Sequence, residues 1–217
     1  MFRLEKKIDL ETIGNKIALE ISPQSWEKNE PIDLDTLYDC YIPTKLQIDT
    51  RYDDLGKLGI PNAFGCTRIV DGVKESIVDK SITYVAKEKE RRHGRSTIAH
   101  ESGHCILHMN LTDFHSIYYS LGINLFRERS SIPAYSDPEW QAWYLAAAIT
   151  MPYSLVENII NNYRNEEMIL RIMVTQFDVN YSWAARRLKD IQKNLTRPII
   201  SGAGQMPTPN GVGTIGG

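Results

Sequence analysis

The pattern of apolar and polar positions changes character about halfway along the chain. Positions 45–49 alternate between polar and apolar residues, which is typical of a half-buried β-strand. Farther on, Asp71 and Gly72 separate two short runs at 66–70 and 73–78. An Asp-Gly pair between such runs predicts a β-hairpin, because glycine adopts the required positive φ at little cost. The first half of the chain therefore predicts three antiparallel strands.

From about residue 96 onward the apolar residues recur at helical spacing. A short helix is also expected earlier, at 31–38, where an early proline and acidic residues form the first turn. The later helices are expected at 96–109, 137–150, 153–163, 166–177 and 182–194. Because strands precede helices and do not alternate with them, the expected fold class is α+β: a small three-stranded antiparallel sheet packed with a helical bundle.

One main domain is expected from this organisation. Residues 1–30 are interpreted as a weakly amphipathic N-terminal lead-in, and residues 31–195 as the domain, with 31–95 mainly strands and 96–195 helical. Residues 196–217 are rich in glycine and proline, with little contiguous apolar surface to offset the entropy lost on ordering. This tail is predicted to be disordered.

Composition and charge exclude several function classes. The formal net charge of −2 gives no field strong enough to gather nucleic acid or anionic lipid. The most apolar segment, 143–151, has about half of the roughly 20 residues needed to span a bilayer, so no membrane partner is expected. The N-terminus is charged from its third residue and lacks the apolar stretch of a secretory signal, which predicts a cytoplasmic protein. None of these features specifies an oligomeric state.

The histidines are concentrated in one window of the chain. All five lie between positions 93 and 115. His100 and His104 are four residues apart, so on a helix they share one face about 6 Å apart along the axis and can bind one ion. Glu101 follows the first of them, close enough to reach a water molecule on the metal. The spacing predicts one Zn²⁺ per chain with Glu101 as a general base, and no other cofactor.

The third ligand of such a zinc site must come from elsewhere. His108 lies about 12 Å along the helix from His100, too far to share the ion, so it is predicted to be a packing or hydrogen-bonding residue. Asn110 stands where a metzincin would have histidine. Glu139 opens the next strongly helical stretch and could be a ligand. Ser136 and Glu139 also have the spacing of a capping box, and spacing alone leaves both roles open.

Two motifs together resemble a known family. Residues 95–108 resemble the active-site helix of the ImmA/IrrE family of metallopeptidases, including the trailing His108. Residues 139–152, in which a glutamate opens a helix that closes with Met-Pro, match the spacing of that family's second motif. A third segment, 177–188, is similar to its C-terminal helix pair, so the resemblance covers roughly 31–195. Departures from the family pattern lie at Ser102, Trp143 and Leu145.

The resemblance implies an activity and a site. It implies that His100 and His104 lie on a zincin-like active-site helix, and it favours Glu139, from the next helical stretch, as the third ligand. It implies a zinc-dependent endopeptidase (a hydrolase) that cleaves a protein substrate with a water molecule on zinc and Glu101 as general base. Family members act on helix-turn-helix transcriptional repressors, often encoded nearby on mobile elements or in stress circuits. A partner of that kind, and a role in transcription regulation, are implied for this chain.

Two alternative functions stay open at the level of sequence. The first is a non-catalytic, antitoxin-like module that binds a partner through the same cleft. The second is a DNA-binding regulator that uses the helices at 166–177 and 182–194. Arg186, Arg187 and Lys189 are the dense positive cluster there, but nearby acidic residues offset them, which argues against nucleic acid.

Two further features carry structural predictions. The basic run at 87–95 is interrupted by Glu88 and Glu90, which favours a solvated connector over an anion-binding segment. Gly103 lies in mid-helix, where glycine costs up to about 1 kcal/mol relative to alanine. That cost is best explained by close approach of another backbone, which we expect to be the helix that begins near Glu139.

Overall fold

The fold is α+β, as predicted: a small sheet packs beside a larger set of helices. The computed structural model describes residues 7–83, 85–109, 118–121 and 137–193, with the backbone alone for 118–121. The predicted tail at 196–217 lies outside the described residues. Among the helices of the described segments, none combines the length and apolar character that a membrane crossing requires.

The described segments contain nine helical segments and four strands. The strands are β1 (Asp49–Asp53), β2 (Ala63–Val70), β3 (Val73–Asp79) and β4 (Tyr118–Leu121). The longer helices are α1 (Lys7–Ile21), α3 (Glu88–Leu107), α4 (Pro138–Thr150), α5 (Tyr153–Asn162), α6 (Glu166–Phe177) and α7 (Tyr181–Gln192). Two shorter helical segments are α2 (Gln24–Lys28) and η2 (Lys80–Ile82), and a π-helix, η1, spans Thr36–Leu46.

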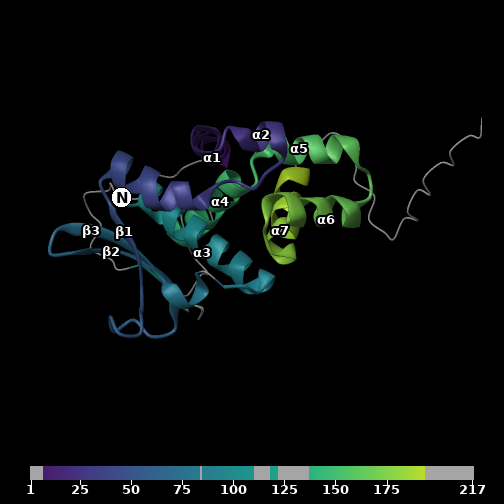
Figure 1. Ribbon diagram of the computed structural model, residues 1–217. Coiled ribbons are helices and arrows are strands. Elements are labelled where there is room, and N and C mark those ends of the chain that lie inside the picture. Colours follow the sequence, from purple (N-terminus) through teal and green to yellow (C-terminus); the bar gives the residue numbers. More distant parts are fainter. Residues whose placement is uncertain (1–6, 84, 110–117, 122–136, 194–217) are drawn as a thin grey trace, which may run out of the picture.

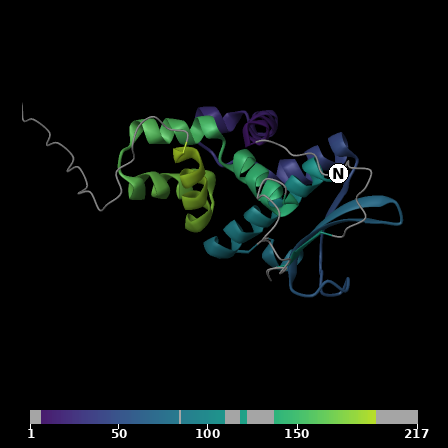
Figure 2. The ribbon, with the colours of Figure 1, turned by 180° about the vertical axis from the view of Figure 1, so that it is seen from behind.

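The sheet and the C-terminal helices lie at opposite ends of the molecule, with α3 and α4 between them (Figure 1). Figure 2 shows the same order from behind. The α1 helix packs along α4, and α3 packs against α4, η1 and the sheet. One large apolar core links these helices, whereas a small second cluster lies around Cys66 and Ile77. The two helices between the ends of the molecule are the ones that carry the candidate site.

The sheet differs from the prediction in two respects. Within the described residues it has four strands, in the order β1-β3-β2-β4. Strand β1 pairs with β3 in parallel, so the sheet is mixed and not purely antiparallel. Residues 54–62 carry the chain from β1 back to the start of β2, and this return places β1 parallel to β3. The predicted hairpin is confirmed, because Asp71 and Gly72 both have positive φ, 51° and 82°, between β2 and β3.

The prediction of a strand at 45–49 was wrong. Residues up to Leu46 belong to η1, and β1 begins only at Asp49. The short helix expected at 31–38 continues instead through Pro43 as η1, which packs against α3 and buries Leu37 and Ile42 in the apolar core. Five alternating positions are too few to separate a strand from the end of a helix, and tertiary packing decided between them.

Close backbone approach fixes α4 between its neighbours. A Cβ atom at Gly103 of α3 would lie 2.6 Å from the carbonyl oxygen of Ala142 and 3.0 Å from its Cα. A Cβ atom at Gly14 of α1 would lie 2.6 Å from the Cβ of Ala148. Distances this short are not tolerated, so both positions require glycine. The expectation that Gly103 faces the helix of Glu139 is confirmed.

Replacing Gly103 with alanine is expected to destabilise the fold despite alanine's higher helix propensity. Because the clashing atoms are backbone, α3 and α4 must move apart, which costs about 1–3 kcal/mol. Urea unfolding measures the loss. Ser102→Ala is the matched control, since it changes the adjacent buried residue without adding an atom; its hydroxyl donates 2.8 Å to the Ile98 carbonyl within α3. A Gly103→Ala variant as stable as the parent protein would show that the helices are not in contact here.

Arginines from the first turns of α3 bind the corner between α6 and α7. Asp178 occupies this corner with φ 50°, and its side chain forms ion pairs with Arg91, Arg92 and Arg95. The Arg95 guanidinium also donates to the Ile32 carbonyl at 3.0 Å. The prediction of a solvated connector was therefore wrong for these three arginines. Helix α3 begins at Glu88, earlier than the expected residue 96, because these contacts hold its first turns against the C-terminal pair.

A second ion pair attaches α7 to the N-terminal helix. The Arg187 side chain is 1% exposed and donates to both carboxylate oxygens of Glu11, at 2.5 and 2.8 Å. Its Nε also donates to the Met151 carbonyl at 3.0 Å. Burial raises the pKa of Glu11, but the bonds and charge of Arg187 outweigh it and leave the pKa lowered. The buried Arg187 is one of the three cations of the candidate DNA-binding cluster, so it is not presented at the surface.

Candidate metal centre

Helix α3 places two histidines against the interior of the protein. His100 and His104 are 0% and 1% exposed, and their Nε2 atoms lie 3.1 Å apart. The four-residue spacing brings the two rings to the same face of α3, with ring centroids 4.6 Å apart. The predicted juxtaposition of the two imidazoles is therefore present.

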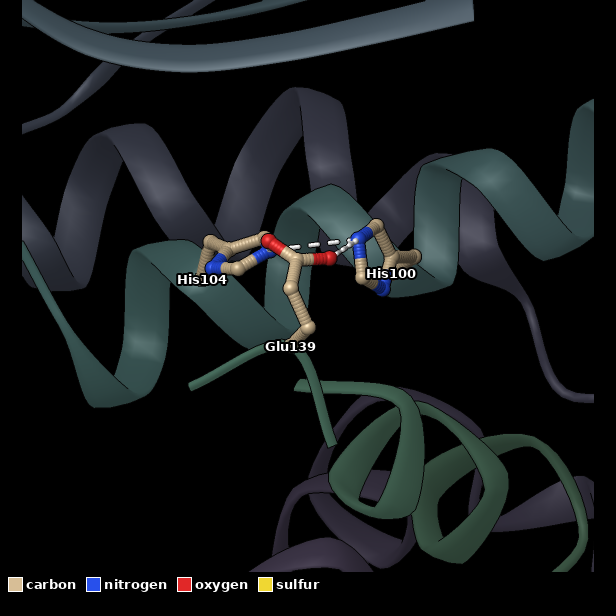
Figure 3. Close-up of side chains that lie close together, drawn as sticks. All are labelled: His100, His104 and Glu139. Carbon is tan, nitrogen blue, oxygen red and sulfur yellow. Dashed lines mark hydrogen bonds and ion pairs between the residues drawn. The ribbon is translucent and has the colours of Figure 1, made fainter. Parts of the chain in front are cut away.

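The carboxylate of Glu139 reaches the same point from α4 (Figure 3). Its Oε2 lies 3.3 Å from Nε2 of His100, and its Oε1 lies 3.2 Å from Nε2 of His104. Asp137 caps α4, because its side chain accepts a hydrogen bond from the Glu139 amide at 3.0 Å. Ser136, the other member of the possible capping box, lies outside the described residues. The orientation of the Glu139 side chain favours the ligand role over the capping role.

The charge state of Glu139 suits a cation. Burial raises the pKa of its carboxyl, but hydrogen bonds and charge from His100 and His104 outweigh burial and hold the pKa well below its usual range. The carboxyl is ionised at neutral pH as a result. The Glu139 side chain is half-buried, and an ionised carboxylate in such a position is stabilised by a positive partner.

His108 fixes which ring nitrogen of His104 carries the proton. His108 is 1% exposed; its Nδ1 lies 3.0 Å from Nδ1 of His104, and its Nε2 lies 3.3 Å from Oε1 of Gln141 on α4. Because an amide oxygen only accepts, the His108 proton lies on Nε2, and its Nδ1 accepts the Nδ1 proton of His104. Burial, aided by His104, lowers the pKa of His108 to about 3, so its ring is neutral.

With Nδ1 of His104 bound to His108, its other ring nitrogen, Nε2, is the one that faces the carboxylate of Glu139, at 3.2 Å. An imidazole nitrogen and a carboxylate oxygen directed at one point can both bind a cation placed there. The three donor atoms from His100, His104 and Glu139 all lie within 4.8 Å of one another. Their mutual separations of 3.1–3.3 Å match the spacing of ligand atoms around one tetrahedral ion. The residues present therefore fit a metal ion.

Glu101 lies beside the cluster without belonging to it. Its side chain is 0% exposed and points to the sheet, where Oε2 accepts a hydrogen bond from the Thr67 hydroxyl at 2.6 Å. Within the described residues, the group that can hold a metal comprises His100, His104 and Glu139 and does not include Glu101. The structure therefore brings the Glu101 carboxylate to Thr67 on the sheet and the other three side chains to one point.

The sequence analysis did not assign a role to several residues that surround the metal centre in the structure. Trp143 stacks on His100 with ring centroids 4.2 Å apart and an interplanar angle of 27°, which restricts the rotation of that imidazole. Gln141 and Thr67 bind His108 and Glu101. The spacing of Trp143, four residues after Glu139 on the same helix, was a signal that could have placed it near the ligands. Thr67 comes from a distant strand, and no local pattern marks it.

A helix that carries His-x-x-x-His beside a small sheet, with a carboxylate supplied by the next helix, defines a candidate metal-dependent hydrolase. The family model of the IrrE N-terminal-like domain, Peptidase_M78, matches residues 71–189. This match spans more than half of the chain, and the chain belongs to that metallopeptidase family. It includes β3, α3 and α4, and so all the residues of the candidate metal centre. Among curated proteins, no relative matches.

Proposed function

We propose that this protein is a zinc-dependent endopeptidase that hydrolyses peptide bonds in a protein substrate. The observation that carries the proposal is the convergence of His100, His104 and Glu139 on one point, with donor atoms 3.1–3.3 Å apart. Two imidazoles and one carboxylate are a ligand set of catalytic zinc sites, which leave a fourth position for water or substrate. Membership of a peptidase family supports the same reading.

The chemistry divides between the metal and the protein. A zinc ion held by the three ligands supplies Lewis acidity, which polarises a scissile carbonyl and lowers the pKa of a water molecule toward about 7. Glu101 then accepts the proton from the attacking water and returns it to the leaving amine. Trp143 and His108 hold the two imidazoles in place, since one stacks on His100 and the other binds Nδ1 of His104.

The proposed substrate is a helix-turn-helix transcriptional repressor, as the family resemblance implies, and the proposed compartment is the cytoplasm, where such repressors act. The alternative of a DNA-binding regulator is disfavoured because Arg187 is buried against Glu11. A non-catalytic binding module would share the same cleft and metal. A cleavage assay distinguishes the two functions, because only the peptidase cuts its protein partner.

The test of the proposal uses the full chain and a helix-turn-helix repressor, chosen from the genes that neighbour its own where one is encoded there. The chain loaded with one equivalent of zinc is expected to cut the repressor at a discrete site, which mass spectrometry of the fragments identifies. Removing zinc with a chelator should abolish cleavage, and adding zinc back should restore it. Stoichiometric zinc binding without cleavage of that repressor, or of any repressor in a panel from the same genome, would favour the binding module.

Replacing His108 with phenylalanine is expected to weaken zinc binding by about 10- to 100-fold. The ring volume is kept, but His104 loses the acceptor that holds its proton on Nδ1. Competition with a chromophoric chelator measures the dissociation constant. His93→Phe is the matched control, because His93 lies on the same helix and packs against Phe64, outside the metal centre. Unchanged zinc affinity in His108→Phe would show that His104 needs no such support.

A further inference from the structure

Strand β2 lies directly against the carboxylate of Glu101. The Thr67 hydroxyl donates to Oε2 of Glu101 at 2.6 Å, and both side chains are 0% exposed. Two residues earlier on the same strand, Gly65 faces the same carboxylate: a Cβ atom there would lie 2.6 Å from Cγ and 2.7 Å from Cδ of Glu101. Alternate residues of a strand share one face, so Gly65 and Thr67 together form one contact surface for the Glu101 carboxylate.

Gly65 and Thr67 contribute to this contact surface in different ways. The absence of a side chain at Gly65 lets the Glu101 carboxylate lie against the strand backbone. Thr67 supplies a hydroxyl donor at the point where the carboxylate arrives. In this bond the Thr67 hydroxyl is the donor, so its proton points toward Glu101.

The direction of that bond determines the direction of two others. The Thr67 and Ser76 hydroxyl oxygens lie 3.1 Å apart, and because the Thr67 proton is already engaged, Ser76 donates to Thr67. Tyr38 of η1 in turn donates to Ser76 at 3.1 Å. Burial raises the pKa of Tyr38 well above its usual value, so the phenol keeps its proton. Three buried hydroxyls, from η1, β3 and β2, thus form one chain that ends on Glu101.

Such a chain restricts where the carboxylate can point. Hydrogen bonds to charged groups are stronger than neutral ones, and consecutive hydroxyls polarise one another. The neighbouring Cys105 thiol also forms hydrogen bonds with Ser76 and Thr67, and burial raises its pKa to about 12. The polar groups meet inside an otherwise apolar core, so water has little access to replace a lost donor.

From this geometry we infer that Thr67 is the positioning residue of Glu101, supported by Ser76 and Tyr38 and made possible by Gly65. The inference rests on the proposed peptidase function for its catalytic consequence. The contact itself is a property of the folded chain and is independent of that function. Thr67 acts through Glu101 and is assigned no contact with substrate.

A double-mutant cycle tests the contact without any activity. The unfolding of the full chain in urea is measured for Thr67→Val, for Glu101→Leu and for the double variant. Thr67→Val alone leaves a buried carboxylate without its donor, whereas the double variant leaves two apolar groups. The unfolding constant of the double variant is expected to depart from the product of the single effects by about tenfold or more.

A second threonine provides the matched control. Thr50 lies on β1, and its hydroxyl donates to the Tyr38 carbonyl at 2.9 Å, away from Glu101. Thr50→Val and Glu101→Leu should combine additively, within about twofold. If Thr67→Val does not fold, the cycle is repeated with Ser76→Ala, for which a smaller coupling of the same sign is expected. If the effects of Thr67→Val and Glu101→Leu on the unfolding constant are additive, the inference is overturned. The same holds for Ser76→Ala and Glu101→Leu where that cycle is used instead.

Kinetics and zinc titration give the functional readout. Thr67→Val is expected to lower kcat by about 10- to 100-fold, because small misplacements of a catalytic group are costly, while KM and zinc affinity stay unchanged. Thr67→Ser keeps the hydroxyl and should restore most of kcat. A loss that serine does not rescue, or one shared by KM, would overturn the positioning role. If the two replacements are additive in a protein that does cleave its substrate, the positioning role of Thr67 is refuted but the peptidase function is not. If the two replacements are coupled in a protein that cleaves nothing, the contact of Thr67 with Glu101 is supported but the peptidase function is refuted.

Discussion

Glu101→Gln is expected to lower kcat by about 10²- to 10⁴-fold, the usual contribution of a general acid or base, while the protein keeps its zinc. Glutamine preserves the shape of the side chain, and its amide oxygen still accepts the Thr67 hydroxyl bond. It cannot accept a proton from water. The fold and the three ligands are therefore expected to be undisturbed, and the whole loss should lie in the chemical step.

Two measurements give this prediction its control. Glu90→Gln makes the same chemical change in the exposed first turn of α3, and should leave kcat unchanged. Zinc content of Glu101→Gln, measured by atomic emission, should remain at one ion per chain. Near-normal cleavage by Glu101→Gln would exclude this residue as the base.

Replacing Glu139 with alanine is expected to weaken zinc binding by about 100-fold or more, since an outer-sphere partner alone is worth about 10- to 100-fold. The carboxylate is the negative ligand of the centre, and it supplies one oxygen toward each histidine. Cleavage should fail at zinc concentrations that saturate the parent protein. The dissociation constant is measured by competition with a chromophoric chelator.

Glu167 provides a matched control for this change. Glu139 is the second residue of α4, and Glu167 is the second residue of α6, where it binds Arg171 at 2.8 Å on the surface. Both replacements remove a carboxylate from the first turn of a helix, so they share the loss of the favourable interaction with the helix dipole. Glu167→Ala should keep full zinc affinity. Equal affinity in the two variants would show that Glu139 is not a ligand.

The stability of the centre depends on how α4 is held. Gly103 sets the distance between α3 and α4, and therefore the distance between the histidine pair and Glu139. On the far side of α4, Tyr144 donates to Glu11 at 2.8 Å, and Glu11 binds Arg187 of α7. The N- and C-terminal helices thus fix the helix that carries Glu139, although neither contributes to the metal centre.

The sequence predicted the parts of the structure that depend on local pattern. Helices α4, α5, α6 and α7 lie close to the ranges that apolar periodicity predicted, whereas α1 lies in the segment interpreted only as a lead-in. The Asp71-Gly72 turn has a specific backbone requirement that glycine meets. The grouping of His100, His104 and Glu139 followed from the resemblance of two motifs at a fixed spacing. Each helix, turn and motif is by itself a short stretch of chain, and the family resemblance linked the two separated motifs.

The sequence did not predict contacts between distant segments. The parallel pairing of β1 with β3 joins residues about 26 positions apart, and alternation within a strand does not identify its neighbour. The contact of Asp178 with Arg91 and its neighbours joins α3 to the corner after α6, so the arginines were expected to be solvated. Thr67 was missed for the same reason, because a strand threonine acquires its role only when α3 packs on the sheet.

The most direct test of the account is where zinc binds. A crystal of the full chain grown with zinc, and recorded on both sides of the zinc absorption edge, gives the position of the ion from anomalous scattering. We predict one peak per chain, about 2.0–2.2 Å from Nε2 of His100, Nε2 of His104 and a carboxylate oxygen of Glu139. Zinc located away from these three residues, or absent from the chain at saturating concentration, would contradict the account.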